Sequence, residues 1–405
     1  MSSTCVIVGG GLAAGKAAEA LREHGHDGRI VLVGAEGHRP YERPPLSKGY
    51  LLGNDELESA FVHTARWYAE HQVELRLGAP ATALDPDAHA VSLGDEPIPY
   101  DKLLIATGAV ARRLPMADDS GAPVAYLRTM EDSERIKGAL QSGRRIAIIG
   151  GGWIGLEVAA AARSAGCDVV VIEALERPLL RVLGPEVAEV FADLHEAHGV
   201  DLRTSASVSA IESAGQRAVV HLGDGSVIEA DLLVVGVGVT PLSGLAEGAG
   251  LRTDNGIVVD AHLRTSHPDV FAAGDVANAY HPDLGRHLRV EHWDNAIGQG
   301  VTAARNMLGA DESYTQLPYF FTDQYDFGME YVGNIGPDGY DEVVLKGDVG
   351  ERVFTAFWLK GGAVLAGMHA NDWDAIDAVR RIVGAATVDA TALRDPAVPL
   401  TDVTT

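Results

Sequence analysis

The pattern of apolar residues predicts that the chain contains the same strand–turn–helix unit twice. Residues 5–8 and 146–149 are short, continuous apolar runs, as in the buried strands of parallel sheets, and a run of glycines follows each of them. Alanine and leucine are frequent in residues 12–22 and 153–165, which predicts that each glycine run leads into a helix. A second apolar strand follows each helix, so both copies are predicted to be β–α–β units.

The last part of the chain has a different pattern. Aromatic residues cluster at 318–325, and β-rich segments and a final helix at about 373–383 follow them. An irregular, proline-containing stretch at 115–123 marks the crossing between the two β–α–β units. The expected fold class is therefore α/β, with two Rossmann-like dinucleotide-binding domains and a small C-terminal α+β domain.

The spacing of the glycines indicates what the two turns bind. In the second copy, Gly150 allows the tight turn, Gly152 lets a phosphate approach the backbone, and Gly155 lets the helix pack close to the strand. The N-terminus of the following helix would point its positive end at the anion. The first copy repeats the pattern at Gly9 and Gly11, and two such sites imply two dinucleotides.

An acidic residue follows the second strand of each copy. Glu173 lies about 20 residues beyond Gly152, which is the spacing of a carboxylate that bonds a ribose hydroxyl. Because a carboxylate repels a 2′-phosphate, Glu173 predicts a preference for NADH, while Arg177 and Arg181 leave some use of NADPH open. Glu36 is the matching residue of the first copy, and its alternative is an ordinary solvated loop residue.

Two further side chains are candidates because of their local sequence. Three prolines stiffen residues 39–48 and favour a fixed position for the charge of Lys48 over an ordinary exposed lysine. The strand that ends in Gly274 and Asp275 places the Asp275 carboxylate at the carboxyl edge of a sheet, where it either bonds a ribityl hydroxyl of a flavin or caps a helix. A helix that begins near residue 293 would present its positive end to a reduced flavin.

Composition narrows the classes of function. The chain has 32 Lys and Arg against 57 Asp and Glu, a net charge of −25 that disfavours nucleic acids and anionic membranes as partners. No apolar segment is long enough to span a membrane and no signal segment is recognised, so we expect a cytoplasmic protein. The two cysteines, Cys5 and Cys167, are expected to be buried core residues, which removes disulfide chemistry and disfavours a metal site in the chain.

Seven short motifs occur along the chain in a specific order and spacing. They are Val-Ile-Val-Gly9-Gly-Gly11-Leu-Ala13, Arg43-Pro-Pro-Leu-Ser-Lys48, Ala106-Thr-Gly108, Tyr126-Leu-Arg128-Thr, Gly150-Gly-Gly152-Trp-Ile-Gly155-Leu-Glu157, Gly274-Asp275 and Pro318-Tyr-Phe-Phe-Thr-Asp-Gln-Tyr325. In this order they resemble the oxygenase-coupled, NADH-dependent ferredoxin reductases, and the resemblance covers essentially the whole chain.

The resemblance implies a glutathione-reductase-like fold with FAD and NADH as cofactors. Residues 1–110 and 240–316 would bind FAD, residues 111–239 would bind NADH, and residues 317–405 would form a C-terminal domain that covers the flavin. The residues that the resemblance and the first glycine turn assign to FAD are Gly9, Gly11, Ala13, Glu36, Arg43, Lys48, Ala81, Arg128, Asp275 and Trp293. The residues assigned to NADH are Gly150, Gly152, Ile154, Gly155, Glu157, Glu173 and Gly238.

The resemblance also implies a reaction. NADH would pass a hydride to the flavin, and electrons would leave singly to a ferredoxin that feeds a cytochrome P450 or a Rieske oxygenase. Lys48 and Glu157 would act as catalytic residues, forming an ion pair at the flavin edge that holds its position and tunes it. Many members have an acidic residue at the position held here by Ala35, so Glu36 would bind the ribose alone.

The implied partner is an acidic iron–sulfur ferredoxin, and the chain would act as a monomer or a homodimer. Because the chain is itself acidic, docking would need a local cationic patch, for which Arg66, Arg289 and Arg305 are candidates. Tyr319 and Phe321 replace tryptophans that are frequent in the family. The alternative functions are a rubredoxin reductase, a monodehydroascorbate-reductase-like enzyme and, in a different class, an apoptosis-inducing-factor-like binding flavoprotein.

Overall fold

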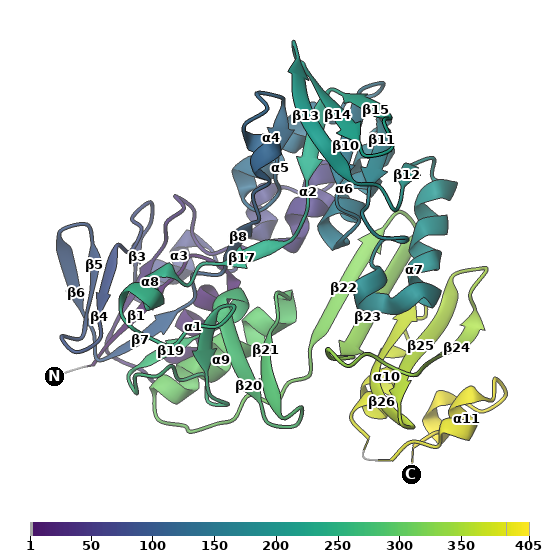
Figure 1. The fold of residues 1–405 in the computed structure, drawn as a ribbon. Coiled ribbons are helices and arrows are strands. Elements are labelled where there is room, and N and C mark those ends of the chain that lie inside the picture. The colour runs from purple at the N-terminus through teal and green to yellow at the C-terminus, as the bar shows by residue number, and fades with distance from the viewer. Residues whose placement is uncertain (1–2, 386, 405) are drawn as a thin grey trace. The chain divides into compact units, whose positions relative to one another are not determined.

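The computed structural model describes residues 3–385 and 387–404, and the chain divides into two compact units. The first unit comprises residues 1–44, 56–110 and 239–318. The second unit comprises residues 45–55, 111–238 and 319–405. Figure 1 colours the chain by residue number, from purple at the N-terminus to yellow at the C-terminus.

The first unit is built on a five-stranded parallel sheet with the order β19-β7-β1-β2-β3. Its strands are β1 (Thr4–Val8), β2 (Arg29–Val33), β3 (Val73–Arg76), β7 (Lys102–Ile105) and β19 (Val270–Ala272). The register places Val6 of the central strand between Val31 and Leu103. Helices α1 (Leu12–Glu23) and α9 (Trp293–Met307) pack closely because small residues face each other: a Cβ at Gly300 would lie 2.5 Å from the Ala13 carbonyl oxygen.

Smaller elements complete the first unit. They are the antiparallel sheet β4 (Ala83–Asp85), β5 (Ala90–Leu93) and β6 (Glu96–Pro99), the sheet β18 (Ile257–Val259), β20 (Ala277–His281) and β21 (Arg286–Arg289), the short strands β8 (Ala109–Ala111) and β17 (Val239–Pro241), the helices α3 (Ala65–Glu70) and α8 (Gly244–Gly248), and the 3₁₀ turns η2 (Leu57–Ala60) and η3 (Gly274–Val276).

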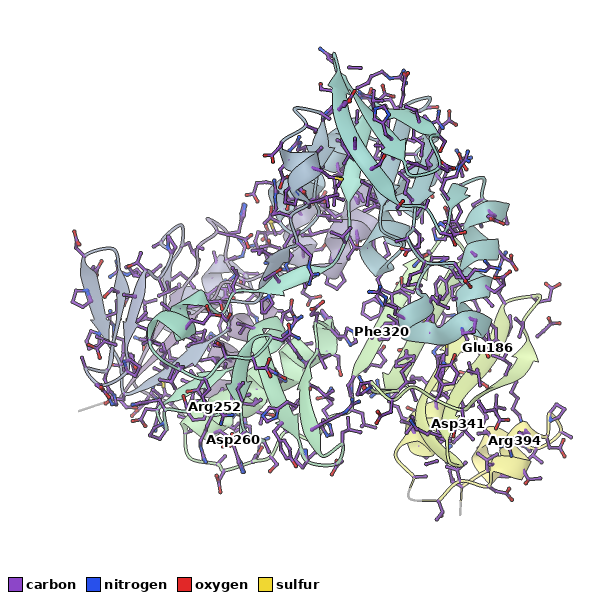
Figure 2. All side chains as sticks on the ribbon, in the orientation of Figure 1. Glu186, Arg252, Asp260, Phe320, Asp341 and Arg394 are labelled. Atoms are coloured by element: carbon purple, nitrogen blue, oxygen red, sulfur yellow. The ribbon has the colours of Figure 1, made fainter. Side chains whose placement is uncertain are left out.

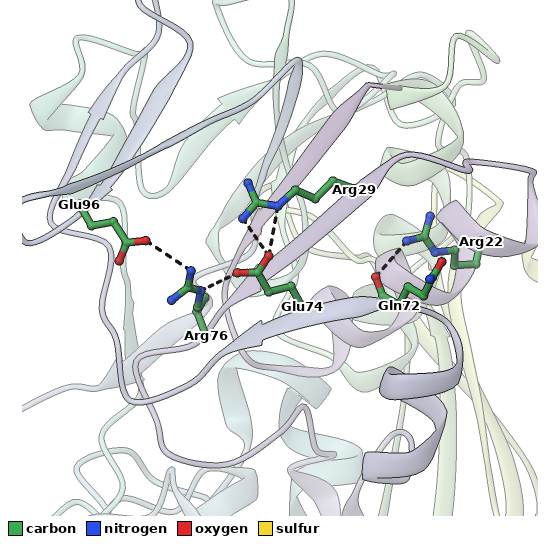
Figure 3. A network of polar contacts seen from close by, with 6 residues as sticks. All are labelled: Arg22, Arg29, Gln72, Glu74, Arg76 and Glu96. Carbon is green, nitrogen blue, oxygen red and sulfur yellow. Dashed lines mark hydrogen bonds and ion pairs between the residues drawn. The ribbon is translucent and has the colours of Figure 1, made fainter. Parts of the chain in front are cut away.

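Charged side chains tie the outer strand β3 to its neighbours, as Figure 3 shows. Glu74 accepts hydrogen bonds from Arg29 of β2 (2.8 Å) and from Arg76 (2.7 Å), and Arg76 also reaches Glu96 (3.3 Å). The Arg22 guanidinium of α1 donates to the carbonyl oxygen that precedes β3, on Gln72 (3.1 Å). Such solvent-exposed pairs contribute little stability each, about 0–1 kcal/mol, so they align this edge and do not replace the apolar core.

The second unit repeats the parallel sheet, in the order β12-β11-β10-β16-β9. Its strands are β9 (Val124–Ala125), β10 (Arg145–Ile149), β11 (Asp168–Ile172), β12 (Asp201–Arg203) and β16 (Leu232–Val235). Its helices are α4 (Pro115–Asp118), α5 (Met130–Ala139), α6 (Trp153–Ser164) and α7 (Leu180–Ala197). An antiparallel sheet of β13 (Val208–Ala214), β14 (Arg217–Leu222) and β15 (Val227–Ala230) lies next to them in sequence and packs on the same core.

The C-terminal residues of the second unit form an antiparallel sheet with the order β22-β23-β26-β25-β24. Its elements are β22 (Tyr319–Gln324), β23 (Phe327–Gly333), β24 (Glu342–Asp348), β25 (Val353–Lys360), β26 (Ala363–Ala370), α10 (Ile376–Val383), α11 (Ala390–Arg394) and η4 (Leu400–Asp402). This sheet is anchored to α7: the buried Trp358 Nε1 donates to the Leu183 carbonyl oxygen (3.0 Å), and the Tyr340 hydroxyl donates to Glu186 (3.1 Å), which Figure 2 labels. The C-terminal sheet and the second β–α–β region therefore form one packed body.

One short segment, residues 45–55, also belongs to the second unit although its neighbours in sequence belong to the first. It contains the end of η1 (Pro44–Ser47) and helix α2 (Gly49–Leu52). The buried Ser133 hydroxyl of α5 donates to the Leu46 carbonyl oxygen (2.7 Å), and the Tyr50 hydroxyl donates to Glu134. These bonds explain why the segment that carries Lys48 is fixed to α5.

The expected fold class is confirmed, with local differences. The helix predicted at about 373–383 is α10, which begins at Ile376 because the Trp373 ring lies against Gly328 instead of entering the helix, and the short helix α11 follows it. The irregular stretch at 115–123 contains the short helix α4, which Pro115 begins. Within the described ranges, no helix is both long and apolar enough to cross a membrane.

Candidate functional site

The first glycine turn joins β1 to α1 and leaves open space at the helix end. Gly9 has a φ of +143°, and a Cβ there would lie 2.0 Å from the Ala106 carbonyl oxygen, so only glycine fits. Gly11 is the N-cap of α1, and no described atom lies within 4 Å of the position that its Cβ would take. Among the described side chains, none caps α1. The turn therefore presents backbone N–H groups to an anion.

The second glycine turn, between β10 and α6, has the same construction. Gly150 has a φ of +106°, and a Cβ there would lie 2.4 Å from the Gly236 carbonyl oxygen. A Cβ at Gly155 would lie 2.0 Å from the Gly150 carbonyl oxygen, which is why the helix can pack so closely. At Gly152, the N-cap of α6, the Cβ position has no described atom within 4 Å and the helix has no described side-chain cap. Both turns thus fit the pyrophosphate of a dinucleotide, and so fit FAD and NADH.

The structure holds Glu36 close to the first turn. The Tyr41 hydroxyl donates to Oε2 of Glu36, and the Arg43 guanidinium donates to Oε1 (3.1 Å). Tyr41 is fully buried, and its backbone pairs with Gly11 in an isolated parallel bridge. Side chains therefore restrain Glu36, which is not a free loop residue. A carboxylate that binds a ribose needs such a fixed position.

Glu173 is held at the second turn by backbone groups. Its carboxylate accepts from the Gly151 N–H (2.7 Å) and from the Leu175 N–H (2.8 Å). These bonds fix the acidic side chain beside the glycines that would hold the pyrophosphate. Arg177, which left NADPH open in the sequence, forms an ion pair with Glu189.

The ion pair predicted between Lys48 and Glu157 is present in the second unit. Lys48 Nζ lies 2.5 Å from Glu157 Oε1, and the exposed fractions of the two side chains are 17% and 4%. Glu157 accepts two more hydrogen bonds, from the Ser47 hydroxyl on Oε2 and from the Thr322 hydroxyl on Oε1 (2.7 Å). A hydrogen bond to a charged group contributes about 1.5–3 kcal/mol, so these two hydroxyl donors help to keep the buried carboxylate in place.

Three separate elements bring this cluster together. Glu157 lies in the second turn of α6, Lys48 is the N-cap of α2, and Thr322 comes from β22 of the C-terminal sheet. Lys48 Nζ also lies 5.4 Å from the centre of the Phe321 ring, a cation–π distance. The Phe321 ring, also from β22, therefore lies next to the lysine of the site.

Asp275 and Trp293, predicted to bind FAD, lie in the first unit. Asp275 is in η3, directly after β19, and its carbonyl oxygen accepts from Arg289 (3.4 Å). Trp293 is the first residue of α9, and its Nε1 donates to Glu42 (2.9 Å). Their direct contact with a cofactor stays a prediction.

The remaining predicted residues lie in both units. In the first unit, Ala81 packs against the core. In the second unit, the Arg128 N–H donates to Asp132 (3.0 Å) at the start of α5, Ile154 is 42% exposed on α6, and Gly238 has a φ of +99°. Arg128 and Lys48 belong to the second unit, whereas the other residues predicted to bind FAD belong to the first.

Sequence reasoning missed the residues that support Glu157. Ser47, Thr322 and Gln324 all lie in motifs that carry the family resemblance, yet none of them was singled out. The sequence signal for two of them is the alternation in β22, where Phe320, Thr322 and Gln324 fall on one face of the strand. All three are buried, so two polar side chains lie on an interior face and need hydrogen-bond partners.

Both cysteines are buried, as predicted. Cys5 is 1% exposed and Cys167 is 0% exposed. Burial raises the pKa of the Cys5 thiol to about 12 and also raises the pKa of Cys167. Because the thiolate is the reactive form, neither residue is suited to redox or nucleophilic chemistry.

Among the described residues, one cluster could offer three metal ligands, His89, His267 and Asp269. Lys102 already forms an ion pair with Asp269, and the Asp269 N–H donates to Nδ1 of His267 (3.3 Å). The Asp269 carboxylate therefore already has a cationic partner in Lys102. We therefore interpret the cluster as a structural hydrogen-bond network.

The three candidate docking arginines are each paired with a carboxylate. Arg66 lies 2.6 Å from Glu70, Arg289 lies 2.5 Å from Glu291, and Arg305 lies 2.5 Å from Glu312. Each positive charge therefore has a carboxylate beside it, and contact of these arginines with a ferredoxin stays a prediction.

The two parallel sheets, each with an open glycine turn, and the buried ion pair are the arrangement expected of an oxidoreductase that binds two dinucleotides. Residues 3–300 match the family model described as pyridine nucleotide-disulphide oxidoreductase, and residues 319–404 match a model described as reductase C-terminal. The chain belongs to the pyridine nucleotide-disulphide oxidoreductase family. FAD and NADH, the cofactors predicted from the sequence, are those of this enzyme class.

Individual relatives are more specific. The chain is 44% identical to the ferredoxin–NAD(+) reductase component of the anthranilate 1,2-dioxygenase system of Burkholderia cepacia, over 98% of each chain. It is 39% identical to putidaredoxin reductase of Pseudomonas putida, over 89% of this chain and 87% of that one. Among solved structures, the covalent putidaredoxin reductase–putidaredoxin complex matches with a TM-score of 0.93 and 37% identity, covering 98% of this chain and 97% of the other. The predicted family resemblance is confirmed.

Proposed function

We propose that this chain is the NADH-dependent, FAD-containing reductase of an oxygenase system, and that it passes electrons singly to an iron–sulfur ferredoxin. The ferredoxin in turn supplies a cytochrome P450 or a Rieske oxygenase. The observation that carries the proposal is the likeness over the whole chain, including the C-terminal sheet, to reductases named for ferredoxin and putidaredoxin. That sheet is part of the site, because its Thr322 bonds Glu157.

The residues of the chain have distinct tasks in this reaction. FAD, when bound, supplies a group that takes two electrons from NADH together and releases them one at a time. The turn at Gly9 and Gly11 would hold the pyrophosphate of FAD, with Glu36 on its ribose. The turn at Gly150 and Gly152 would hold NADH, with Glu173 on the ribose nearest the turn.

The ion pair of Lys48 and Glu157 places a fixed positive charge in a site that is largely closed to water. Glu157 cannot move without breaking three hydrogen bonds, so the ammonium group of Lys48 is held in one position. A charge that is already oriented needs no reorganisation when electrons move, which is the main electrostatic contribution that a protein makes to such a step.

The remaining assignments are part of the same proposal. We assign FAD to residues 1–110 and 240–316, NADH to residues 111–239, and to residues 317–405 a C-terminal domain that covers the flavin. The partner is an acidic ferredoxin, and the chain acts in the cytoplasm as a monomer or a homodimer. With a net charge of −25 on the chain and its candidate arginines paired, docking depends on short-range contacts. We therefore expect ferredoxin reduction to be no slower at 0.3 M than at 0.05 M salt, since screening removes a repulsion.

The test is NADH-dependent reduction of cytochrome c by the purified holoenzyme, with and without an added ferredoxin from the same source. Strong stimulation by the ferredoxin is the expected result. A holoenzyme that oxidises NADH but gains nothing from any such ferredoxin would contradict the proposal and favour a rubredoxin reductase or a monodehydroascorbate-reductase-like enzyme. A flavoprotein without turnover would instead support a binding role.

A further inference from the structure

A chain of buried hydrogen bonds leads from Glu157 into the interior of the second unit. The Thr322 hydroxyl donates to Glu157 Oε1 (2.7 Å), and the Gln324 amide Nε2 donates to Thr322 Oγ1 (3.1 Å). Oε1 of Gln324 lies 2.7 Å from His195 Nε2, and the Tyr325 hydroxyl lies 3.4 Å from His195 Nδ1. Thr322 and Gln324 are 1% exposed, and His195 is 0% exposed.

The donors and acceptors that each group has available fix the direction of donation along these hydrogen bonds. The Glu157 carboxylate can only accept when it is ionised, so the single hydroxyl proton of Thr322 is committed to it. Thr322 must then accept from the amide nitrogen of Gln324, which orients that amide and turns its oxygen toward His195. His195 must therefore carry its proton on Nε2. Its Nδ1 is then an acceptor, and the Tyr325 hydroxyl is placed to donate to it.

The state of His195 agrees with this direction. Burial lowers the pKa of His195 to about 4, so the imidazole is neutral at ordinary pH and has one donor and one acceptor nitrogen. The ring is also held by an edge-on contact with Tyr325, at 5.3 Å between ring centres. Each donor in this series of hydrogen bonds therefore points toward Glu157.

We propose that Thr322, Gln324 and His195 are positioning residues for the Lys48–Glu157 pair. They fix the Glu157 carboxylate through a hydrogen-bond chain of one polarity that joins α7, β22 and α6. The inference rests on the proposed function in one respect, namely that the Lys48–Glu157 pair supports reduction of the flavin by NADH. It goes beyond that function by giving the C-terminal sheet and α7 a part in the NADH half of the reaction.

The chain offers a matched set of variants. Thr322→Val keeps the shape of the side chain, removes the donor to Glu157 and leaves the Gln324 amide without its acceptor. Thr322→Ser restores the hydroxyl. Thr355→Val is the control, because Thr355 is also a buried threonine of the C-terminal sheet (2% exposed) but its hydroxyl donates to the Lys346 carbonyl oxygen (3.4 Å) and not to the site.

The measurement is anaerobic stopped-flow of the FAD-loaded enzyme with NADH, followed by the loss of flavin absorbance, together with the midpoint potential of the flavin and the melting temperature. We expect Thr322→Val to lower the limiting rate about ten-fold, in line with the loss of one hydrogen bond to a charged group, with little change in the apparent Kd of NADH. The flavin midpoint potential should shift in Thr322→Val and not in the control. Thr322→Ser should recover the limiting rate to within about two-fold of the unaltered enzyme. The limiting rate of Thr355→Val should also stay within about two-fold, even if its melting temperature falls as far as that of Thr322→Val.

Two results would overturn the inference: an unchanged limiting rate and potential in Thr322→Val, or an equal slowing in Thr355→Val. Gln324→Met serves as a second variant if Thr322→Val does not fold, with the same expected slowing and the same contrary result. Because these measurements need no ferredoxin, they are separate from the test of the proposed function. An enzyme that NADH reduces but that cannot reduce a ferredoxin would fail that test and leave this inference to be decided by the variants.

Discussion

The two glycine turns have the same backbone but lead to helices with different tasks. In both, the first glycine lies against a carbonyl oxygen that follows a neighbouring strand, that of Ala106 in one unit and of Gly236 in the other. In both, the N-cap glycine faces open space. The fifth residue after that N-cap differs: it is Lys16 in α1 and Glu157 in α6. The two turns are therefore alike in their backbone, and the units differ in the charged residue that the following helix carries.

Lys16 and Glu157 show how strongly context changes a charged residue. Lys16 pairs with Glu19 on the same helix (2.8 Å), and both side chains are about a quarter exposed. Such a pair contributes about 0.3–0.5 kcal/mol. Glu157 is buried, and its partners come from two other segments that are distant in sequence. Only the second arrangement fixes a charge in a closed site.

The acidic residues beyond the two turns differ in a related way. Glu36 is oriented by the side chains of Tyr41 and Arg43, whereas both oxygens of Glu173 accept from backbone N–H groups of its own turn and loop. The position of Glu173 is therefore built into the fold of the second turn. Glu36 depends on two neighbouring side chains and is more easily changed by substitution.

The largest effect should come from removing one member of the buried ion pair. Lys48→Met leaves the Glu157 charge without its cation, so we expect a loss of about 3 kcal/mol or more in the free energy of unfolding. Because the fixed positive charge is also lost from the site, flavin reduction by NADH should slow about 100-fold. The matched control is Lys16→Met, which removes an exposed lysine from the equivalent helix of the first unit and should leave the rate within about two-fold. Stopped-flow of both FAD-loaded variants is the measurement. An unchanged rate in Lys48→Met would show that the ion pair has no catalytic part.

The sequence predicted the repeated parts of the fold well because their determinants are local. Apolar runs, glycine spacing and helix composition lie within about 30 residues in each β–α–β unit, the length of one such motif. This is why the strands Thr4–Val8 and Arg145–Ile149 lie where the apolar runs predicted them. The buried cysteines followed from their place at such strands.

The support of Glu157 could not be predicted in the same way because it is not local. Ser47 and Thr322 lie 110 and 165 residues from Glu157 in sequence. Residues 45–55 also belong to the second unit, to which a hydrogen bond from α5 ties them. The sequence pattern did not predict that this segment leaves the first unit. The family resemblance supplied the pairing of Lys48 with Glu157. The hydrogen-bond chain behind it required the structure.

The next effect in size concerns the second glycine turn. Gly155→Ala puts a methyl group 2.0 Å from the Gly150 carbonyl oxygen, so we expect a loss of about 1–3 kcal/mol in the free energy of unfolding and a lower melting temperature. Gly152→Ala meets no described atom within 4 Å, so the melting temperature should stay the same while the KM for NADH rises about ten-fold. Equal melting temperatures for the two variants would contradict the roles given to these glycines.

The smallest effect expected is on the choice between NADH and NADPH. Glu173→Gln keeps one acceptor oxygen for the Gly151 or the Leu175 N–H but removes the negative charge that repels a 2′-phosphate. The ratio of kcat/KM for NADH over NADPH should fall about ten-fold, the change that follows from losing one charge-assisted hydrogen bond. Glu36→Gln, at the matching position of the first unit, should leave that ratio unchanged and weaken retention of FAD instead. If the unaltered enzyme used NADPH as well as NADH, or if Glu36→Gln changed the ratio as much as Glu173→Gln, the assignment of the two turns to different dinucleotides would be wrong.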